Sequence, residues 1–200
     1  MTNRLGFLAA AAFSLLAAAY ATAVGFGVAQ AGLDQPIVDP VLWIMEVLTL
    51  LSALLIVVLL AAIHALAVPE RKIFGVIALS FGAIFAGLTC AVHFVALTAG
   101  RQTDFTALLW PSTLYAVELL AWDVFLGLAL LFAAPVFNGN GRQAVIRWML
   151  SITGALCLAG VLGPILDNMA VQRIGMVGYG VVLPVTCVLL ALSFRDGWVE

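Results

Sequence analysis

Five ionisable side chains of this 200-residue chain lie inside long apolar stretches of the sequence: Glu46, His64, His93, Glu118 and Asp123. If those stretches cross a membrane, a charged side chain at the bilayer centre costs about 2.5 to 3.5 kcal/mol on insertion scales. Each of these residues therefore needs a partner or a function. Carboxylates and imidazoles are the groups that transfer protons in general acid–base catalysis, so proton transfer is the first chemistry to consider.

Three of these residues lie at a similar depth in three different predicted helices. With a rise of about 1.5 Å per residue, Glu46 lies about 8 Å from the outer end of its helix, His93 about 9 Å and Glu118 about 10 Å. Hydrogen bonding between helices can account for any one buried carboxyl group, but it does not require a shared depth. The sequence therefore predicts that Glu46, His93 and Glu118 are catalytic residues of one site in the outer half of the bilayer.

Asp123 is a fourth candidate catalytic residue, placed deeper in the same helix as Glu118. It lies about 18 Å along that helix, near the bilayer centre, and about 140° around it from Glu118, so the two carboxylates cannot share one pocket wall. We expect Asp123 to pair with another helix.

The expected ligand-binding residues come from helix faces and helix breaks. Tyr115, Glu118 and Trp122 follow a spacing that places them on one helix face. Glycines and prolines weaken the last two helices near their outer ends, next to Asp167, Asn168 and Tyr179, and backbone broken at membrane depth is tolerated where it lines a cavity. The predicted ligand-binding residues are Tyr115, Trp122, Tyr179, Asp167 and Asn168.

Several functional classes are excluded or unsupported. The net charge is -2 and no basic cluster exceeds Arg71-Lys72, which argues against nucleic-acid binding. Phosphate-binding, zinc-protease, serine-hydrolase and C-x-x-C motifs are missing from the sequence. His64 and His93 differ too much in depth to clamp a haem, and three ligands from three helices without a local motif predict no metal site. We therefore expect no cofactor.

The helices that would position these residues are membrane helices. The chain is 65% hydrophobic and 9% charged, whereas about a quarter of the residues of a soluble domain are charged. Apolar runs long enough to span a bilayer predict an all-α bundle of six transmembrane helices in one domain, residues 1–200. The runs cover approximately 5–29, 41–68, 73–99, 111–137, 146–166 and 172–194.

The positive-inside rule predicts the orientation of the bundle. Six of the eight basic residues fall on one side, which places both termini in the cytoplasm. The first run also resembles a secretory signal with an A-x-A site near Ala21, and its cleavage would leave five helices. Because the apolar stretch is longer than the hydrophobic region of a usual signal peptide, we expect the helix to be retained.

The central half of the chain resembles small bacterial polytopic membrane proteins of uncharacterised activity. The resemblance lies in Leu109–Ser112, Glu118–Asp123 and Leu131–Phe137, with the turn Pro69–Lys72. The resemblance implies a multi-pass protein of the bacterial inner membrane, and it implies no particular activity. The layout of carboxylates, a histidine and aromatic residues is similar by analogy to integral-membrane sterol isomerases and terpene cyclases, without a motif that matches residue by residue.

Three functional hypotheses follow. In the first, the protein binds a lipophilic small molecule in an outer-half cavity and isomerises or cyclises it by acid–base chemistry, with Glu118 as the acid and Glu46 or His93 as the proton acceptor. The second is a small proton-coupled carrier that uses Glu118 and Asp123. The third is a non-catalytic membrane subunit or scaffold. The expected partners are membrane lipids and the lipophilic ligand, and a homo-oligomer or a partner subunit is left open.

Overall fold

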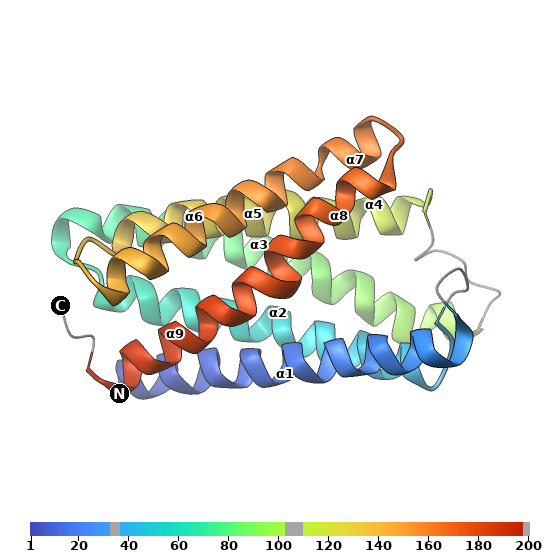
Figure 1. Cartoon of the computed structure of the whole chain (residues 1–200), viewed down its shortest axis with the longest axis horizontal. Coiled ribbons are helices and arrows are strands. Elements are labelled where there is room, and N and C mark those ends of the chain that lie inside the picture. Colours follow the sequence, from blue (N-terminus) through green and yellow to red (C-terminus); the bar gives the residue numbers. More distant parts are fainter. Residues whose placement is uncertain (33–36, 103–109, 198–200) are drawn as a thin grey trace.

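Six helical spans run side by side through the molecule (Figure 1). The structure is a computed structural model, and it describes residues 1–32, 37–102 and 110–197. The first three spans are single helices, whereas each of the last three is built from consecutive segments. They are α1 (Thr2–Ala31), α2 (Val41–Leu66), α3 (Lys72–Leu97), α4 (Thr113–Leu119) with α5 (Gly127–Ala133), α6 (Arg142–Gly160) with α7 (Leu162–Ile165), and α8 (Met169–Val177) with α9 (Leu183–Arg195).

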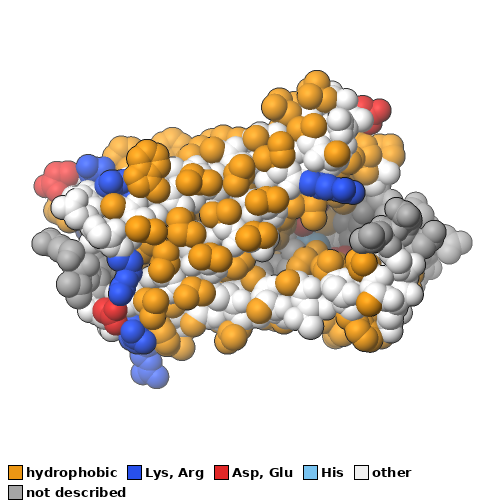
Figure 2. Space-filling view, in the orientation of Figure 1, with side chains coloured by type: hydrophobic (Ala, Val, Ile, Leu, Met, Phe, Trp, Pro, Cys, Tyr) orange, Lys and Arg blue, Asp and Glu red, His pale blue; other side chains and the backbone are white. Residues whose placement is uncertain are grey.

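The all-helical prediction is confirmed for the described residues, which contain no strand. All six spans are long and apolar enough to cross a membrane, which indicates a multi-pass membrane protein. Their ends differ from the predicted ones by no more than a few residues. Large apolar side chains cover the outside of the bundle between its two ends (Figure 2), as lipid contact requires.

Neighbouring spans are mostly consecutive in the chain. α1 packs against α2 and against α9, and α2 packs against α3. The sixth span crosses the bundle diagonally, so that α9 lies beside α1 and α8 lies beside α6 (Figure 1). The two termini lie at the same end of the bundle, as an even number of spans requires.

The small residues of the third span face the interior. Gly82, Ala86, Thr89 and His93 are all buried. A methyl group on Gly82 would lie 2.3 Å from Leu60 Cδ1, so α2 and α3 pack closely at this point. This close approach allows side chains of α2 and α3 to meet nearer the end of the bundle opposite the termini.

Polar side chains cap two helices at the end of the bundle opposite the termini. Asp39 Oδ1 accepts a hydrogen bond from the Trp43 N–H at 3.1 Å, and Ser112 Oγ accepts one from the Tyr115 N–H at 3.1 Å. α2 begins at Val41, and Pro40 is its N-cap residue. The helix still receives its first side-chain cap from Asp39.

Asp39 also joins α2 to the 3₁₀ turn Ala99–Gln102 that follows α3. Arg101 Nη2 donates to Asp39 Oδ1 at 3.0 Å, and Arg101 Nη1 donates to Oδ2. These hydrogen bonds from Arg101 hold the pKa of the Asp39 carboxyl below its ordinary value. A carboxyl whose pKa is lower in the folded state stabilises the fold above its unfolded pKa, and this stabilisation is lost as the pH falls through the folded pKa.

We expect Asp39→Asn to lower stability slightly at pH 7 and to have less effect at pH 3. The side chain is 50% exposed, so the ion pair should contribute only about 0.2 to 1 kcal/mol. Asparagine retains the capping oxygen, so the substitution measures the contribution of the Asp39 charge alone. Thermal unfolding of both proteins in detergent at the two pH values measures the effect. An equal loss at both pH values would show that the charge does not stabilise the fold.

Candidate functional site

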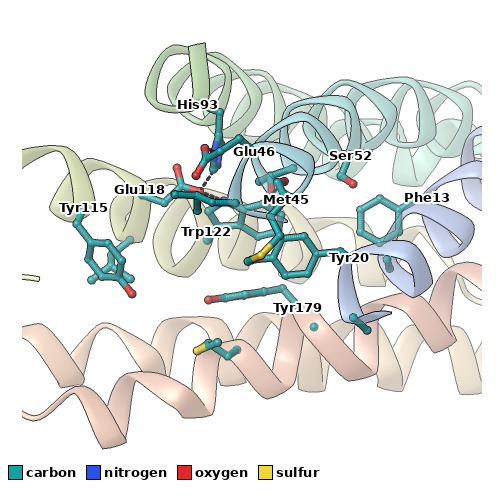
Figure 3. Close-up of a pocket in the computed structure, with 17 residues that line it drawn as sticks. Phe13, Tyr20, Met45, Glu46, Ser52, His93, Tyr115, Glu118, Trp122 and Tyr179 are labelled. Carbon is teal, nitrogen blue, oxygen red and sulfur yellow. Dashed lines mark hydrogen bonds and ion pairs between the residues drawn. The ribbon is translucent and has the colours of Figure 1, made fainter. Parts of the chain in front are cut away.

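His93 lies between two glutamates from two other spans (Figure 3). Its Nδ1 is hydrogen-bonded to Glu46 Oε2 of α2, and its Nε2 lies 2.7 Å from Glu118 Oε1 of α4. Glu46 and His93 are buried, and the Glu118 side chain is 15% exposed. The structure therefore brings together the three residues that share a depth in the sequence.

Glu118 is also fixed by the next turn of its own span. Trp122 Nε1 donates to Glu118 Oε1 at 2.6 Å, so this one oxygen faces both the indole and the imidazole. The other oxygen, Glu118 Oε2, is buried and has no hydrogen-bond partner among the described residues. The Trp122 ring packs edge-on against Phe85 and at an angle against Tyr179, both with ring centroids 4.9 Å away.

Two π-helical segments lie at this level of the bundle. One covers Leu120–Leu126 between α4 and α5 and contains Trp122, and the other covers Gly178–Val182 between α8 and α9 and contains Tyr179. The second segment lies where Pro184 cannot donate the backbone hydrogen bond of a regular α-helix. Local widening of a helix is frequent at functional sites, because it redirects side chains.

The three residues border a cavity of about 360 Å³ that opens on one face of the bundle. This volume is at the lower end of the range for small-molecule sites. Figure 2 shows a hollow on this face between α8 and α1, with acidic and histidine side chains at its floor. The walls come from five spans: Phe13, Ala17, Tyr20 and Ala21 of the first; Leu42, Met45, Glu46, Thr49 and Ser52 of the second; His93 of the third; Tyr115, Glu118, Leu119 and Trp122 of the fourth; and Met176, Tyr179 and Gly180 of the sixth.

Asp123 lies behind the cavity wall. It is fully buried, and Gln172 Nε2 of α8 donates to its Oδ2 at 3.4 Å and to the Tyr179 hydroxyl oxygen at 3.3 Å. Gly160 and Gly175 pack directly against the carboxyl group, since a methyl group on Gly175 would lie 2.4 Å from Asp123 Oδ1. Asp123 thus pairs with another helix, as its helical angle predicts, and hydrogen bonds through Gln172 and Tyr179 link it to the cavity.

Two of the predicted ligand-binding residues do not line the cavity. Asp167 lies in the exposed turn between α7 and α8, with a φ of 49°. Asn168 Oδ1 accepts a hydrogen bond from the Ala170 N–H at 3.1 Å and so caps α8. The fifth helix does break near Gly160, but the residues after the break form a helical hairpin turn outside this cavity.

Sequence reasoning missed one wall of the cavity and one buried polar residue. Phe13, Tyr20 and Met176 line the cavity, but apolar and aromatic residues give no signal against an apolar background. Gln172 is 2% exposed, but it is the first residue of the predicted run 172–194, where a polar side chain gives no signal.

Both imidazole nitrogens of His93 are engaged by carboxylates, so the ring has no free lone pair for a metal ion. Within the described ranges, no group of three His, Cys, Asp or Glu side chains is arranged to hold a metal. The comparisons with family models, curated proteins and solved structures find no match to this chain. The function must therefore be argued from the site itself.

Proposed function

We propose that this protein binds a lipophilic small molecule in the cavity and transfers a proton to or from it. One observation carries the proposal: His93 joins Glu46 and Glu118 at the wall of an open cavity that is otherwise lined mostly by apolar and aromatic side chains. Structural hydrogen bonding between helices would satisfy these groups anywhere in the bundle, and it would not require an adjoining cavity.

Glu118 is the residue that would exchange a proton with the ligand. Its Oε2 has no hydrogen-bond partner in the described part of the chain, whereas its Oε1 is held by Trp122 and His93. When Glu118 gives up or takes up a proton, His93 can shift a proton between Glu118 and Glu46, so the charge is shared across the three groups. A proton added to one ligand atom and removed from another gives an isomerisation that consumes nothing.

The membrane setting follows from surface and charge. We propose a multi-pass protein of the bacterial inner membrane, with both termini in the cytoplasm. In Figure 2 the basic side chains gather mainly at the end of the bundle where the termini lie, which supports this orientation by the positive-inside rule. The cavity would then belong to the outer half of the bilayer.

The two other hypotheses rank lower. A proton-coupled carrier needs a polar path from the cavity to the opposite end, but the described core there is mostly apolar, as at Ile56, Leu60 and Leu190. The buried hydroxyl groups of Thr153 and Thr186 donate to carbonyl oxygens of their own helices. A scaffold would present small residues to a partner helix. Gly82 and Ala86, one such pair, are buried within this chain, whereas Ala155 is exposed and Ala159 is half-buried.

Lipid extraction and mass spectrometry of the purified protein test the proposal. We expect wild type to carry a discrete lipophile that is lost from the triple variant Glu46→Gln, His93→Ala, Glu118→Gln, because the variant removes the polar wall of the cavity. A matched control, Glu70→Gln with Asp196→Asn, removes exposed charges outside the cavity and should retain the ligand. If wild type and triple variant both carry only bulk phospholipid, the proposed function is wrong.

A further inference from the structure

The two hydrogen bonds of His93 determine the charge of the site. Each contact between a ring nitrogen and a carboxylate oxygen needs one proton, whichever atom carries it. With no further proton on Glu118 Oε2, two carboxylates and an imidazole that share two protons have a net charge of -1. The result is the same when His93 is an imidazolium and when one glutamic acid donates to a neutral ring.

Among the described residues, no cationic side chain inside the cavity balances this charge; Arg101, which interacts with Glu46 from outside the cavity, is itself paired with Asp39. No lysine or arginine is among the described residues that line the cavity, and Trp122 contributes only a neutral N–H group. The oxygen that remains free, Glu118 Oε2, is buried at the wall. In a low-dielectric surrounding, an unbalanced negative charge strongly favours a nearby cation.

Aromatic rings surround the same space. All three tyrosines of the chain, Tyr20, Tyr115 and Tyr179, line the cavity together with Trp122. Figure 3 shows these rings around the space that Glu46 and Glu118 also border. The faces of tyrosine and tryptophan attract cations, including quaternary ammonium groups, because the ring quadrupole is negative there.

We infer that the ligand is an organic cation with an apolar body, such as a lipophilic amine or a quaternary ammonium compound, whose single positive charge lies against Glu118. This inference rests on the proposed function, because it names the chemical class of the ligand of that same cavity. The cavity volume of about 360 Å³ fits such a molecule better than a two-chain phospholipid. The opening beside α1 and α8 gives it access from the surrounding lipid.

Two apolar ions of nearly equal size and shape provide the test: tetraphenylphosphonium, a cation, and tetraphenylborate, an anion. Their binding to the full chain in lipid nanodiscs is measured by titration calorimetry, with empty nanodiscs as the reference for partitioning. We expect the cation to bind about tenfold or more tightly than the anion. Glu118→Gln should weaken cation binding by a similar factor. Glu70→Gln removes the same charge on the exposed turn between α2 and α3 and should leave binding unchanged.

Equal binding of the two ions, tighter binding of the anion, or binding of neither would overturn the inference. An equal loss of cation binding in Glu70→Gln and Glu118→Gln would do the same, because it would indicate an effect of overall charge. If Glu118→Gln fails to fold, the comparison of cation binding with anion binding to the wild-type protein still tests the inference. Extraction of a discrete neutral or anionic lipophile would support the proposed function and overturn only this inference.

Discussion

Replacing His93 by alanine is expected to destabilise the protein by about 3 to 5 kcal/mol, the usual cost of removing one partner from a buried ion pair. The substitution leaves Glu46 and Glu118 without the group that joins them. Glu46 is only 5% exposed and has no other hydrogen bond between side chains in the described structure, so the substitution leaves its carboxylate without a side-chain partner. Thermal or denaturant unfolding in detergent measures the loss.

A second substitution tests whether the loss of stability in His93→Ala comes from the unpaired carboxylates or from the missing volume of the imidazole ring. In the double variant His93→Ala, Glu46→Gln, one of the two carboxylates becomes a neutral amide, so much of the lost stability should return. Cys90→Ala is the matched control for the loss of side-chain volume on α3. Cys90 lies about one turn before His93 and is half-buried. If Glu46→Gln restores nothing, the loss comes from the missing ring volume, and the ionic account of the site is wrong.

Gly163→Ala is expected to destabilise the helical hairpin of α7 and α8 by about 1 to 3 kcal/mol, as overpacking typically does. A methyl group at this position would lie 2.5 Å from the backbone nitrogen of Gln172 and 2.7 Å from its Cα. Backbone atoms cannot rotate away as the end of a flexible side chain can, so α8 must move. This movement would also displace the Gln172 amide from Asp123 and Tyr179.

Gly87→Ala and Gly25→Ala are the matched controls for this prediction. Both glycines lie within helices, and a methyl group at either would meet no atom within 4 Å. Because alanine is the better helix former, these variants should be neutral or stabilised by about 0.5 to 1 kcal/mol. Unfolding temperatures of the three single variants provide the comparison. Equal temperatures for all three would show that the close contact of α7 and α8 does not limit stability.

Hydropathy alone was sufficient to predict the six spans. Apolar runs of bilayer length have few alternatives to a helix, since unsatisfied backbone groups are costly in lipid. The depth of Glu46, His93 and Glu118 was also available from the sequence, because the rise per residue in a helix is constant. The lateral arrangement of the helices was not available, since depth does not say which helices are neighbours.

The failures have the same origin. Asp167 and Asn168 lie at the predicted outer end of the fifth span, but only the packing of α7 on α8 shows that they form a turn instead of a cavity wall. Tyr20 could not be identified because an aromatic side chain in an apolar helix suits a lipid-facing position as well as an internal one.

The sequence by itself determined the composition of the bundle: how many spans there are, how deep each ionisable residue lies, and that Asp123 and Glu118 point in different directions. Only the tertiary structure decided that Glu46 and Glu118 meet on the two nitrogens of one imidazole, that Gln172 links Asp123 to Tyr179, and that α1 completes the cavity. The physical reason is that local backbone geometry fixes position along a helix, whereas contact across the bundle depends on how small residues such as Gly82 and Gly163 allow the helices to approach.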